Sequence, residues 1–249
     1  MERRTFLTAA AASMIAPRTF AADAPPLKVL SSMSAQGAFS EIEPMIRKAG
    51  VQMNVAFSAT VPIAEQIDKG ETADLIIIAK GTVARLAKEG RVIAATDLFV
   101  SEEGVAVADN APTPVIRNKE DFRKLVAASP SIAVTARGVS GMRLQQMLRD
   151  LGLSEVLEKR ALLVDEGFTA TRLLKGEVAI AVQQLSELKA AGAKNFVRFP
   201  DEMQVPTTFT VAIMKSTTQT IAAETAVRIM ASKDAAPAWV RSLVAPLNK

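Results

Sequence analysis

Residues 27–46 read LKVLSSMSAQGAFSEIEPMI and combine a short apolar run, a polar connector and a helical pattern. Residues 28–30 predict a short buried strand, and from Ala38 apolar residues recur at helical spacing. Between these two elements lies a small polar connector, residues 31–37. A helix that begins after such a connector presents free backbone N–H groups and a partial positive charge, which favours anion binding. Serine also caps helices, so Ser31 and Ser32 could serve only as caps.

Two further small polar turns follow predicted strands, SATVP at residues 58–62 and TARGVSG at residues 135–141. The unbroken apolar run at residues 73–79 predicts a strand buried on both faces, which is typical of a parallel sheet. Alternating strands and helices indicate an α/β fold, and the stretch DNAPTP at residues 109–114 has the composition of a linker. We therefore predict two lobes, residues 25–107 with 207–249 and residues 108–206. Ligands of open α/β sheets bind at the carboxyl ends of the strands, where these turns lie.

The composition excludes several classes of chemistry. The 249 residues contain no Cys and no His, so sites built from those side chains are absent: zinc sites, thiol nucleophiles and Ser-His-Asp triads. The formal charge is +4, with basic residues scattered along the chain, and Phe 10, Trp 1 and Tyr 0 offer little surface for base stacking. We expect no nucleic-acid partner, no metal and no cofactor.

The N-terminus has the pattern of an export signal. Arg3 and Arg4 begin the sequence RRTFL, a short apolar run follows, and the small residues at 22–24 offer a cleavage site. This pattern resembles a twin-arginine signal peptide over residues 1–24. We therefore expect a periplasmic protein that is cleaved near Ala22 to Ala24.

From about residue 27 onward the chain resembles the periplasmic solute-binding proteins related to the molybdate-binding component of ABC importers. The resemblance rests on SSMSAQGAFSEI, FSATVPIAEQIDKGETADLIIIA, SIAVTARGVSGMRLQQMLRDLG and GEVAIAVQQLSEL, in that family's order and spacing. It implies the type II periplasmic binding protein fold, in which each lobe is a mixed sheet flanked by helices and the ligand binds in the cleft between them. It also implies a monomer that binds a small anion and works with a membrane permease.

The resemblance further implies a set of ligand-binding positions. They are Ser34, Ala59, Thr60, Ser140, Gly167 and Phe168. The family's molybdate binders place a Tyr where this chain has Gln183, and Arg137 is an additional cation whose bidentate guanidinium suits a carboxylate. We therefore expect an organic di- or tricarboxylate to outcompete molybdate.

An enzymatic alternative comes from a periplasmic aconitate isomerase, which shares this fold and the IAVQQLSEL-like region. Moving a double bond within a tricarboxylate requires a base, an acid and stabilisation of carbanion-like charge. The candidate bases are Glu187, Asp165, Glu166 and Lys80, with Arg137 supplying positive charge. Other interpretations stay open: Arg137 and Lys80 could be exposed surface cations, and Gln183 and Gln184 could be surface residues at a helix start.

Overall fold

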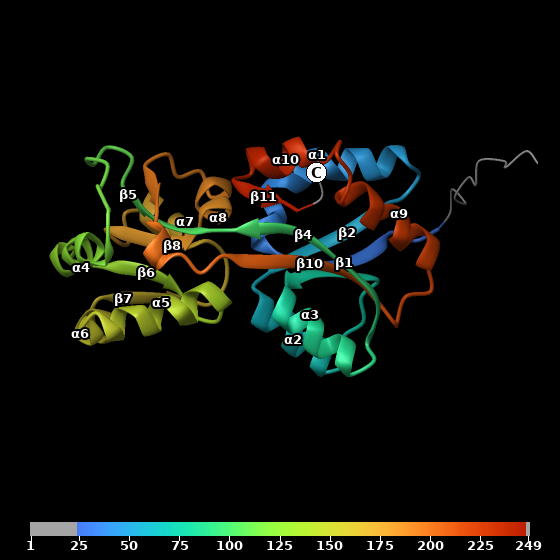
Figure 1. Ribbon diagram of the computed structural model, residues 1–249, viewed down its shortest axis with the longest axis horizontal. Helices are drawn as coiled ribbons and strands as arrows, with labels where there is room; N and C mark the ends of the chain where they lie inside the picture. Colours follow the sequence, from blue (N-terminus) through green and yellow to red (C-terminus); the bar gives the residue numbers. More distant parts are fainter. Residues whose placement is uncertain (1–23, 248–249) are drawn as a thin grey trace, which may run out of the picture.

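The computed structural model describes residues 24–247. The predicted signal peptide therefore lies, apart from Ala24, outside the described residues. Along the described part of the chain, no helix is long and apolar enough to cross a bilayer. The chain forms two lobes side by side, and the long ribbons of β4 and β10 run between them (Figure 1).

The first sheet lies in the lobe that contains both ends of the described chain. Within residues 24–247 it has six strands in the order β11-β4-β10-β3-β1-β2. These strands span Val244–Pro246, Val92–Ser101, Thr207–Met214, Leu75–Ala79, Leu27–Ser32 and Met53–Ser58. β1 is parallel to β2 and β3, whereas β10 is antiparallel to β3 and β4, so the sheet is mixed. All residues of β3 are buried, as its unbroken apolar run predicts.

Helices cover both faces of the first sheet (Figure 1). One face carries α1, α9 and α10, which span Gln36–Lys48, Thr220–Met230 and Ala236–Arg241, and the other carries α2 and α3, which span Thr60–Asp68 and Lys80–Lys88. Under the first group, Phe39, Phe99 and Trp239 pack with ring centroids 4.7–6.4 Å apart. Under the second group lie Ile63, Ile67 and other aliphatic residues. Because helices bury both faces of the sheet, the ends of its strands are held in fixed positions.

The second sheet repeats this arrangement with a different strand order, β7-β6-β8-β5-β9, among the described residues. Its strands span Ala161–Val164, Ile132–Thr135, Ile180–Gln184, Glu103–Val107 and Phe196–Arg198. The flanking helices α4, α5, α6, α7 and α8 span Lys119–Ala128, Val139–Asp150, Ser154–Lys159, Thr169–Leu174 and Leu185–Ala190. β6 is parallel to β7 and β8, and β5 is antiparallel to β8 and β9, so this sheet is also mixed.

The chain crosses between the lobes earlier than the sequence predicts. The predicted boundary after residue 107 placed β5 in the first lobe, but β5 pairs with β8 and β9 of the second sheet. The outward crossing is therefore Glu102, between the end of β4 and the start of β5. Because the chain stays extended there, no Gly- or Pro-rich break marks the crossing, and the linker-like stretch at 109–114 lies inside the second lobe.

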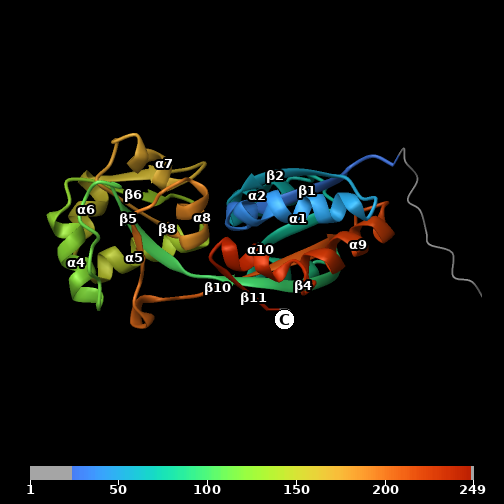
Figure 2. The same cartoon turned by 90° about the horizontal axis from the view of Figure 1, so that it is seen from above.

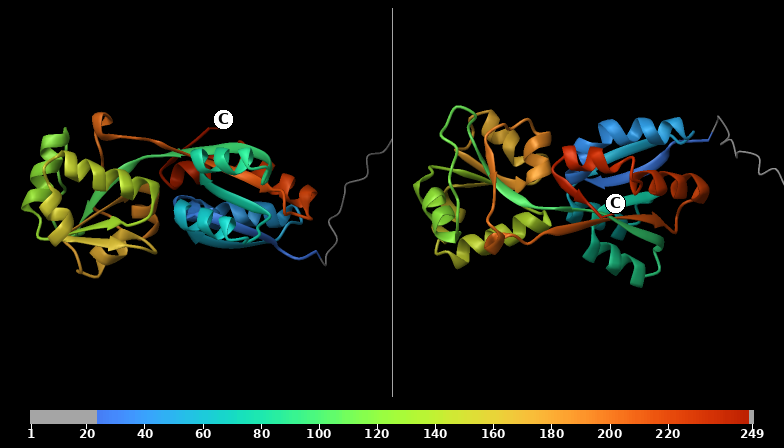
Figure 3. Two further views of the ribbon diagram at one scale, coloured as in Figure 1. Left: turned by 90° about the horizontal axis from the view of Figure 1, so that it is seen from below. Right: turned by 45° about the horizontal axis from the view of Figure 1, so that its top comes forward.

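The two crossings lie next to each other and are tied together (Figures 2 and 3). Gln204, beyond a short 3₁₀ helix at Asp201–Met203, accepts a hydrogen bond from the Glu103 N–H at 3.1 Å and donates one to the Glu103 carbonyl at 2.8 Å. Thr207, three residues later, already begins β10 of the first sheet. This double crossing is the place where one lobe can turn relative to the other.

Residues 27–46 fold slightly differently from the prediction. β1 continues through Ser32, because its parallel pairing with β2 extends to Ser58. A 3₁₀ turn, η1, follows at Met33–Ala35, and α1 begins at Gln36. The Ser32 side chain accepts a hydrogen bond from the N–H of Ser34 at 3.3 Å, so Ser32 is a cap. The predicted connector is therefore part strand and part first helical turn.

Candidate functional site

A small polar pocket lies where the two lobes meet, and we call it the inner pocket. It is lined by Ser32, Met33, Ser34, Ala59, Thr60, Thr135, Gly138, Ser140, Gln184, Glu187, Thr207 and Phe209. These residues come from the ends of β1, β6 and β8, from the start of β10 and from the starts of η1, α2, α5 and α8, so both lobes contribute. Its volume is about 20 Å³, which is room for about one water molecule. A ligand larger than a water molecule does not fit into the inner pocket of this conformation.

Backbone donors of two helices face this pocket from opposite lobes. Thr60 begins α2 in the first lobe, and Ser140 is the second residue of α5 in the other. Neither helix has a side-chain cap, so no N-cap side chain accepts a hydrogen bond from the N–H groups of its first turn. The Thr60 hydroxyl instead accepts a hydrogen bond from the N–H of Ala79 at 3.2 Å. Helix starts of this kind favour a negative group between them.

The start of α5 reaches the pocket because of a glycine. A Cβ on Gly141 would lie 2.0 Å from the carbonyl oxygen of Thr135, which no side chain can tolerate. The absence of a side chain lets the first turn of α5 pack directly on the end of β6.

Glu187 is the one ionisable side chain among the residues that line the inner pocket. It lies on α8 of the second lobe and is only 7% exposed. Its Oε1 accepts a hydrogen bond of 2.7 Å from the Ser34 hydroxyl of the first lobe. The two buried side chains therefore bridge the cleft.

Burial raises the pKa of Glu187 from its ordinary value near 4.5 to about 7, because the carboxylate loses its hydration. The hydrogen bond from Ser34 lowers the pKa, and so does the Gln183 amide, although Gln183 Nε2 completes no hydrogen bond within the described residues. The nearby charge of Glu103 raises it further. At neutral pH this carboxyl can hold a proton or release it, which is the property required of a general acid or base.

Glu103 and Arg143 form a second buried polar group beside the crossing. Glu103 Oε1 accepts a hydrogen bond of 3.0 Å from Arg143 Nη2, and the same nitrogen lies 2.8 Å from the hydroxyl of Thr207. Burial raises the pKa of Glu103, while the Arg143 guanidinium acts against that rise. Arg143 belongs to α5 and Thr207 to β10, so this group also connects the lobes. No local sequence pattern indicates this group, because its three residues come from three separate elements.

A larger cavity of about 520 Å³, which we call the outer chamber, adjoins the inner pocket. It is lined by Leu30, Met33, Gln36, Ala56, Phe57, Ser58, Ala59, Ile63, Gln66, Glu166, Gly167 and Phe168. Met33 and Ala59 line both spaces, so the two are neighbours. Phe57 from the first lobe and Phe168 from the second form apolar walls of the outer chamber. Its polar lining consists of a few neutral amides and hydroxyls together with one acidic side chain, Glu166.

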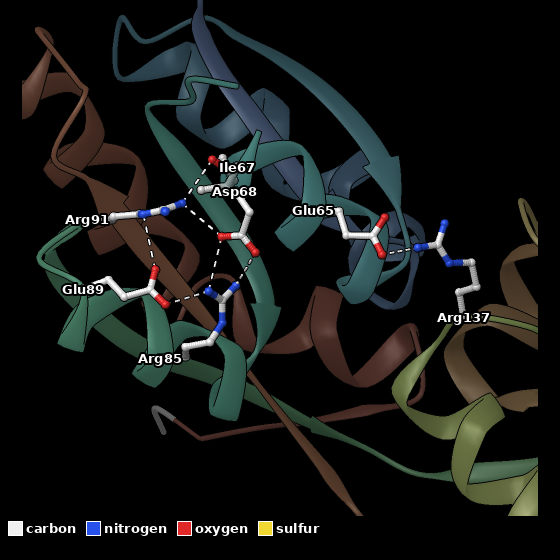
Figure 4. Close-up of polar contacts among 7 residues, drawn as sticks. All are labelled: Glu65, Ile67, Asp68, Arg85, Glu89, Arg91 and Arg137. Atoms are coloured by element: carbon white, nitrogen blue, oxygen red, sulfur yellow. Dashed lines mark hydrogen bonds and ion pairs between the residues drawn. The ribbon is translucent and has the colours of Figure 1, made fainter. Parts of the chain in front are cut away.

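Arg137 forms an ion pair across the cleft. Its guanidinium donates to the carboxylate of Glu65 on α2, and both side chains are partly exposed (Figure 4). Figure 4 also shows that Asp68, at the end of α2, pairs with Arg85 of α3 and with Arg91. These contacts fix the position of α2 against the first lobe. Arg137 lines neither the inner pocket nor the outer chamber, so its predicted contact with a ligand stays a prediction.

The remaining predicted residues divide between the two spaces and the protein surface. Ser34, Ala59, Thr60 and Ser140 line the inner pocket, while Gly167 and Phe168 line the outer chamber with Glu166. Asp165 is exposed and lines neither. Lys80 is exposed and pairs with Asp97 of β4 at 2.6 Å, away from both spaces, so the role of a buried base does not fit it.

The two glutamines at the end of β8 face different surroundings. Gln183 accepts hydrogen bonds from the Thr169 N–H at 2.8 Å and from its hydroxyl at 2.9 Å, so it holds the start of α7 and does not line the inner pocket. Gln184 lines the inner pocket, and its Oε1 is buried without a hydrogen-bond partner among the described residues. Both glutamines are buried, so neither is the surface residue that the sequence allowed. Period-two alternation along β8 separates their roles.

The chain has two mixed α/β lobes joined by a double crossing, and polar strand ends and helix starts face each other across the cleft. This arrangement is that of a two-lobed solute-binding protein. The model of the bacterial extracellular solute-binding protein family matches residues 27–242, and the chain belongs to this family.

Individual relatives carry different functions. An aconitate isomerase from Pseudomonas sp is 29% identical over 231 residues, which cover 89% of this chain and 88% of the relative. The molybdate-binding protein ModA of Mycobacterium bovis is 25% identical over 204 residues, which cover 77% of this chain and 73% of that protein. Among solved structures, the periplasmic molybdate-binding protein of Azotobacter vinelandii matches with a TM-score of 0.76 at 16% identity, covering 88% of this chain and 98% of that one. The structural match shows the fold alone.

Proposed function

We propose that this chain is the periplasmic substrate-binding protein of an ABC-type importer and that it binds a small organic carboxylate between its lobes. The observation that carries this proposal is the pair of adjoining spaces in the cleft. A carboxylate placed at the inner pocket meets the helix starts at Thr60 and Ser140, and a carbon skeleton then extends along the apolar walls of the outer chamber. A tetrahedral oxyanion such as molybdate would leave that chamber of about 520 Å³ without a role.

The remaining parts of this proposal come from the family. Export to the periplasm rests on the signal-like residues 1–24, and delivery to a membrane permease rests on membership of the solute-binding family. The monomeric state expected from the resemblance belongs to the same proposal.

Thermal unfolding in the presence of a panel of anions tests the choice of ligand. A ligand that binds only the folded protein raises the melting temperature by mass action. We expect tricarballylate and citrate to raise it more than molybdate, tungstate or sulfate. Ser34→Ala should reduce the shift, whereas Ser40→Ala, a matched change at an exposed position of α1, should not. A larger shift with molybdate than with every carboxylate would refute the proposed ligand class.

A second candidate function, isomerisation of aconitate, is favoured by Glu187. A buried carboxyl with a pKa of about 7 can remove a proton from a carbon next to a ligand carboxylate and return a proton two carbons away, moving the double bond. The helix starts around the inner pocket would stabilise the negative charge of the intermediate. The aconitate isomerase relative supports the choice of this reaction over others.

Proton NMR of purified protein mixed with cis-aconitate separates the two functions. Saturable binding without conversion is expected of the importer component. Conversion to the trans isomer that disappears in Glu187→Gln but persists in Glu43→Gln would instead establish the isomerase.

A further inference from the structure

Glu187 is an acidic side chain in a pocket that we propose binds anions, and the proposed function does not explain its presence there. No Lys or Arg is among the residues that line the inner pocket in the described part of the chain. An ionised Glu187 would repel a ligand carboxylate there, and water to screen the repulsion is largely excluded by a cavity of about 20 Å³. Two carboxylates at such close range require a proton between them.

A second oxygen in the inner pocket lacks a hydrogen-bond donor. Gln184 Oε1 is buried, lines the same pocket and meets no donor within residues 24–247. The Ser34 hydroxyl already uses its hydrogen in the bond to Glu187 Oε1. A proton on the carboxyl, or on a ligand bound beside it, offers a donor to the Gln184 oxygen, beside Gln183 Nε2 and Ser186 Oγ, two buried donors that have no partner among the described residues.

The other charged groups near α8 are directed elsewhere. Glu103 of β5 is the one ionisable group whose charge bears on Glu187, and Arg143 of α5 is paired with it. On the remaining elements packed against α8, the charges form exposed pairs or lie exposed. On α1, Glu41 pairs with Arg241, Glu43 pairs with Arg47, and Lys48 is exposed. On α7, Arg172 pairs with Glu177. Lys189 of α8 itself donates to the carbonyl of Arg241. Arg143 does reach Thr207 of the inner pocket, and its buried Nε has no partner among the described residues, but its charge is balanced by the ion pair with Glu103.

We infer that Glu187 determines ligand specificity by sharing one proton with a carboxylate of the ligand, so that binding above neutral pH takes up a proton from solvent. The inference rests on the proposed function and narrows its ligand class. A carboxylate is basic enough to share a proton strongly with another carboxyl. Sulfate is the anion of a stronger acid, binds a shared proton poorly and is repelled by an ionised Glu187. The raised pKa of Glu187 is consistent with this role, because the proton is available near neutrality.

Isothermal titration calorimetry with tricarballylate measures the coupling directly, since this ligand has no double bond to isomerise. We expect the affinity of the unmodified protein to fall by about tenfold for each pH unit above the range in which Glu187 ionises. At pH 8.5, titrations in two buffers with different ionisation enthalpies should show close to one proton taken up per ligand. Glu187→Gln, which copies the shape of the protonated carboxyl, should bind with pH-independent affinity and no proton uptake. Glu43→Gln, at a partly exposed position of α1, should keep the pH dependence.

The outcomes separate this inference from the function on which it rests. Tricarballylate binding with equal affinity from pH 7.5 to 9 and no proton uptake would overturn the inference and leave the proposed function standing. Absence of tricarballylate binding at every pH would overturn both. The two-buffer measurement needs no variant, so it remains decisive even if Glu187→Gln fails to fold.

Discussion

At the scale of single residues, Glu187 couples the stability of the protein to pH. Its folded pKa of about 7 lies above the ordinary value near 4.5, so the folded protein holds the proton more tightly than the unfolded chain. Stability associated with this group is therefore fully present below about pH 4.5 and is lost as the pH rises through about 7.

Glu187→Gln removes this pH-dependent cost. The difference in free energy of unfolding, variant minus unmodified protein, should therefore increase by about 2–3 kcal/mol as the pH is raised from 5 to 8. Denaturant unfolding followed by the fluorescence of Trp239, which is buried in the first lobe, measures both values. Glu43→Gln removes only a surface ion pair and should change stability by less than about 1 kcal/mol at either pH. An equal effect of Glu187→Gln at both pH values would mean that the carboxyl is not held neutral.

Arg137 and Glu65 give a second prediction at this scale. Arg137 directly precedes Gly138, which lines the inner pocket, and its ion pair with Glu65 holds it at the edge of the cleft. We expect Arg137→Ala to weaken tricarballylate binding by about 1.5–3 kcal/mol, the range for a hydrogen bond to a charged group. Glu65→Gln should not weaken it, because it frees the guanidinium for the ligand. If calorimetry gives Arg137→Ala the same affinity as the unmodified protein, Arg137 serves only to pair with Glu65.

At the scale of elements, the start of α5 depends on a residue without a side chain. Gly141→Ala places a methyl group 2.0 Å from the Thr135 carbonyl, so α5 must shift away from β6. We expect a loss of about 1–3 kcal/mol in the free energy of unfolding, as for other overpacked sites. Gly81→Ala in α3, where no atom lies within 4 Å, should instead stabilise by about 0.5–1 kcal/mol. Equal effects of the two substitutions in denaturant unfolding would contradict this account of α5.

The elements also explain which parts of the site could be predicted. Ser34, Thr60 and Ser140 follow strands and precede or begin helices, and that local pattern is visible in the sequence. The roles of Gln183 and Gln184 depend on which face of β8 each one occupies, and two adjacent glutamines give no clue to that. Glu103 and Arg143 meet only because β5 joins the second sheet, a pairing that no local pattern reveals.

At the scale of the whole molecule, the fold class and the two mixed sheets follow from alternating strands and helices together with the family resemblance. The crossing point was misplaced, because an extended chain passes from β4 to β5 without a break in composition. We expect motion about this crossing to admit the ligand, since the inner pocket has a volume of only about 20 Å³.

A reversible link between the lobes tests that motion. The chain contains no Cys, so Glu65→Cys with Arg137→Cys introduces two unique thiols on opposite sides of the cleft. Linking them with a reducible bis-maleimide should slow tricarballylate association by at least about tenfold, and reduction of the linker should restore it. Stopped-flow measurements on each single-Cys variant after the same treatment provide the control. An unchanged association rate in the linked protein would show that the ligand enters without separation of the lobes.

A crystal structure of the protein with tricarballylate tests most directly whether a carboxylate binds between the lobes. We expect one ligand that bridges the lobes, with a carboxylate within hydrogen-bond distance of Glu187 and Ser34 and with its carbon chain against Phe57 and Phe168. A ligand bound outside the cleft, or a carboxylate that avoids Glu187, would contradict it.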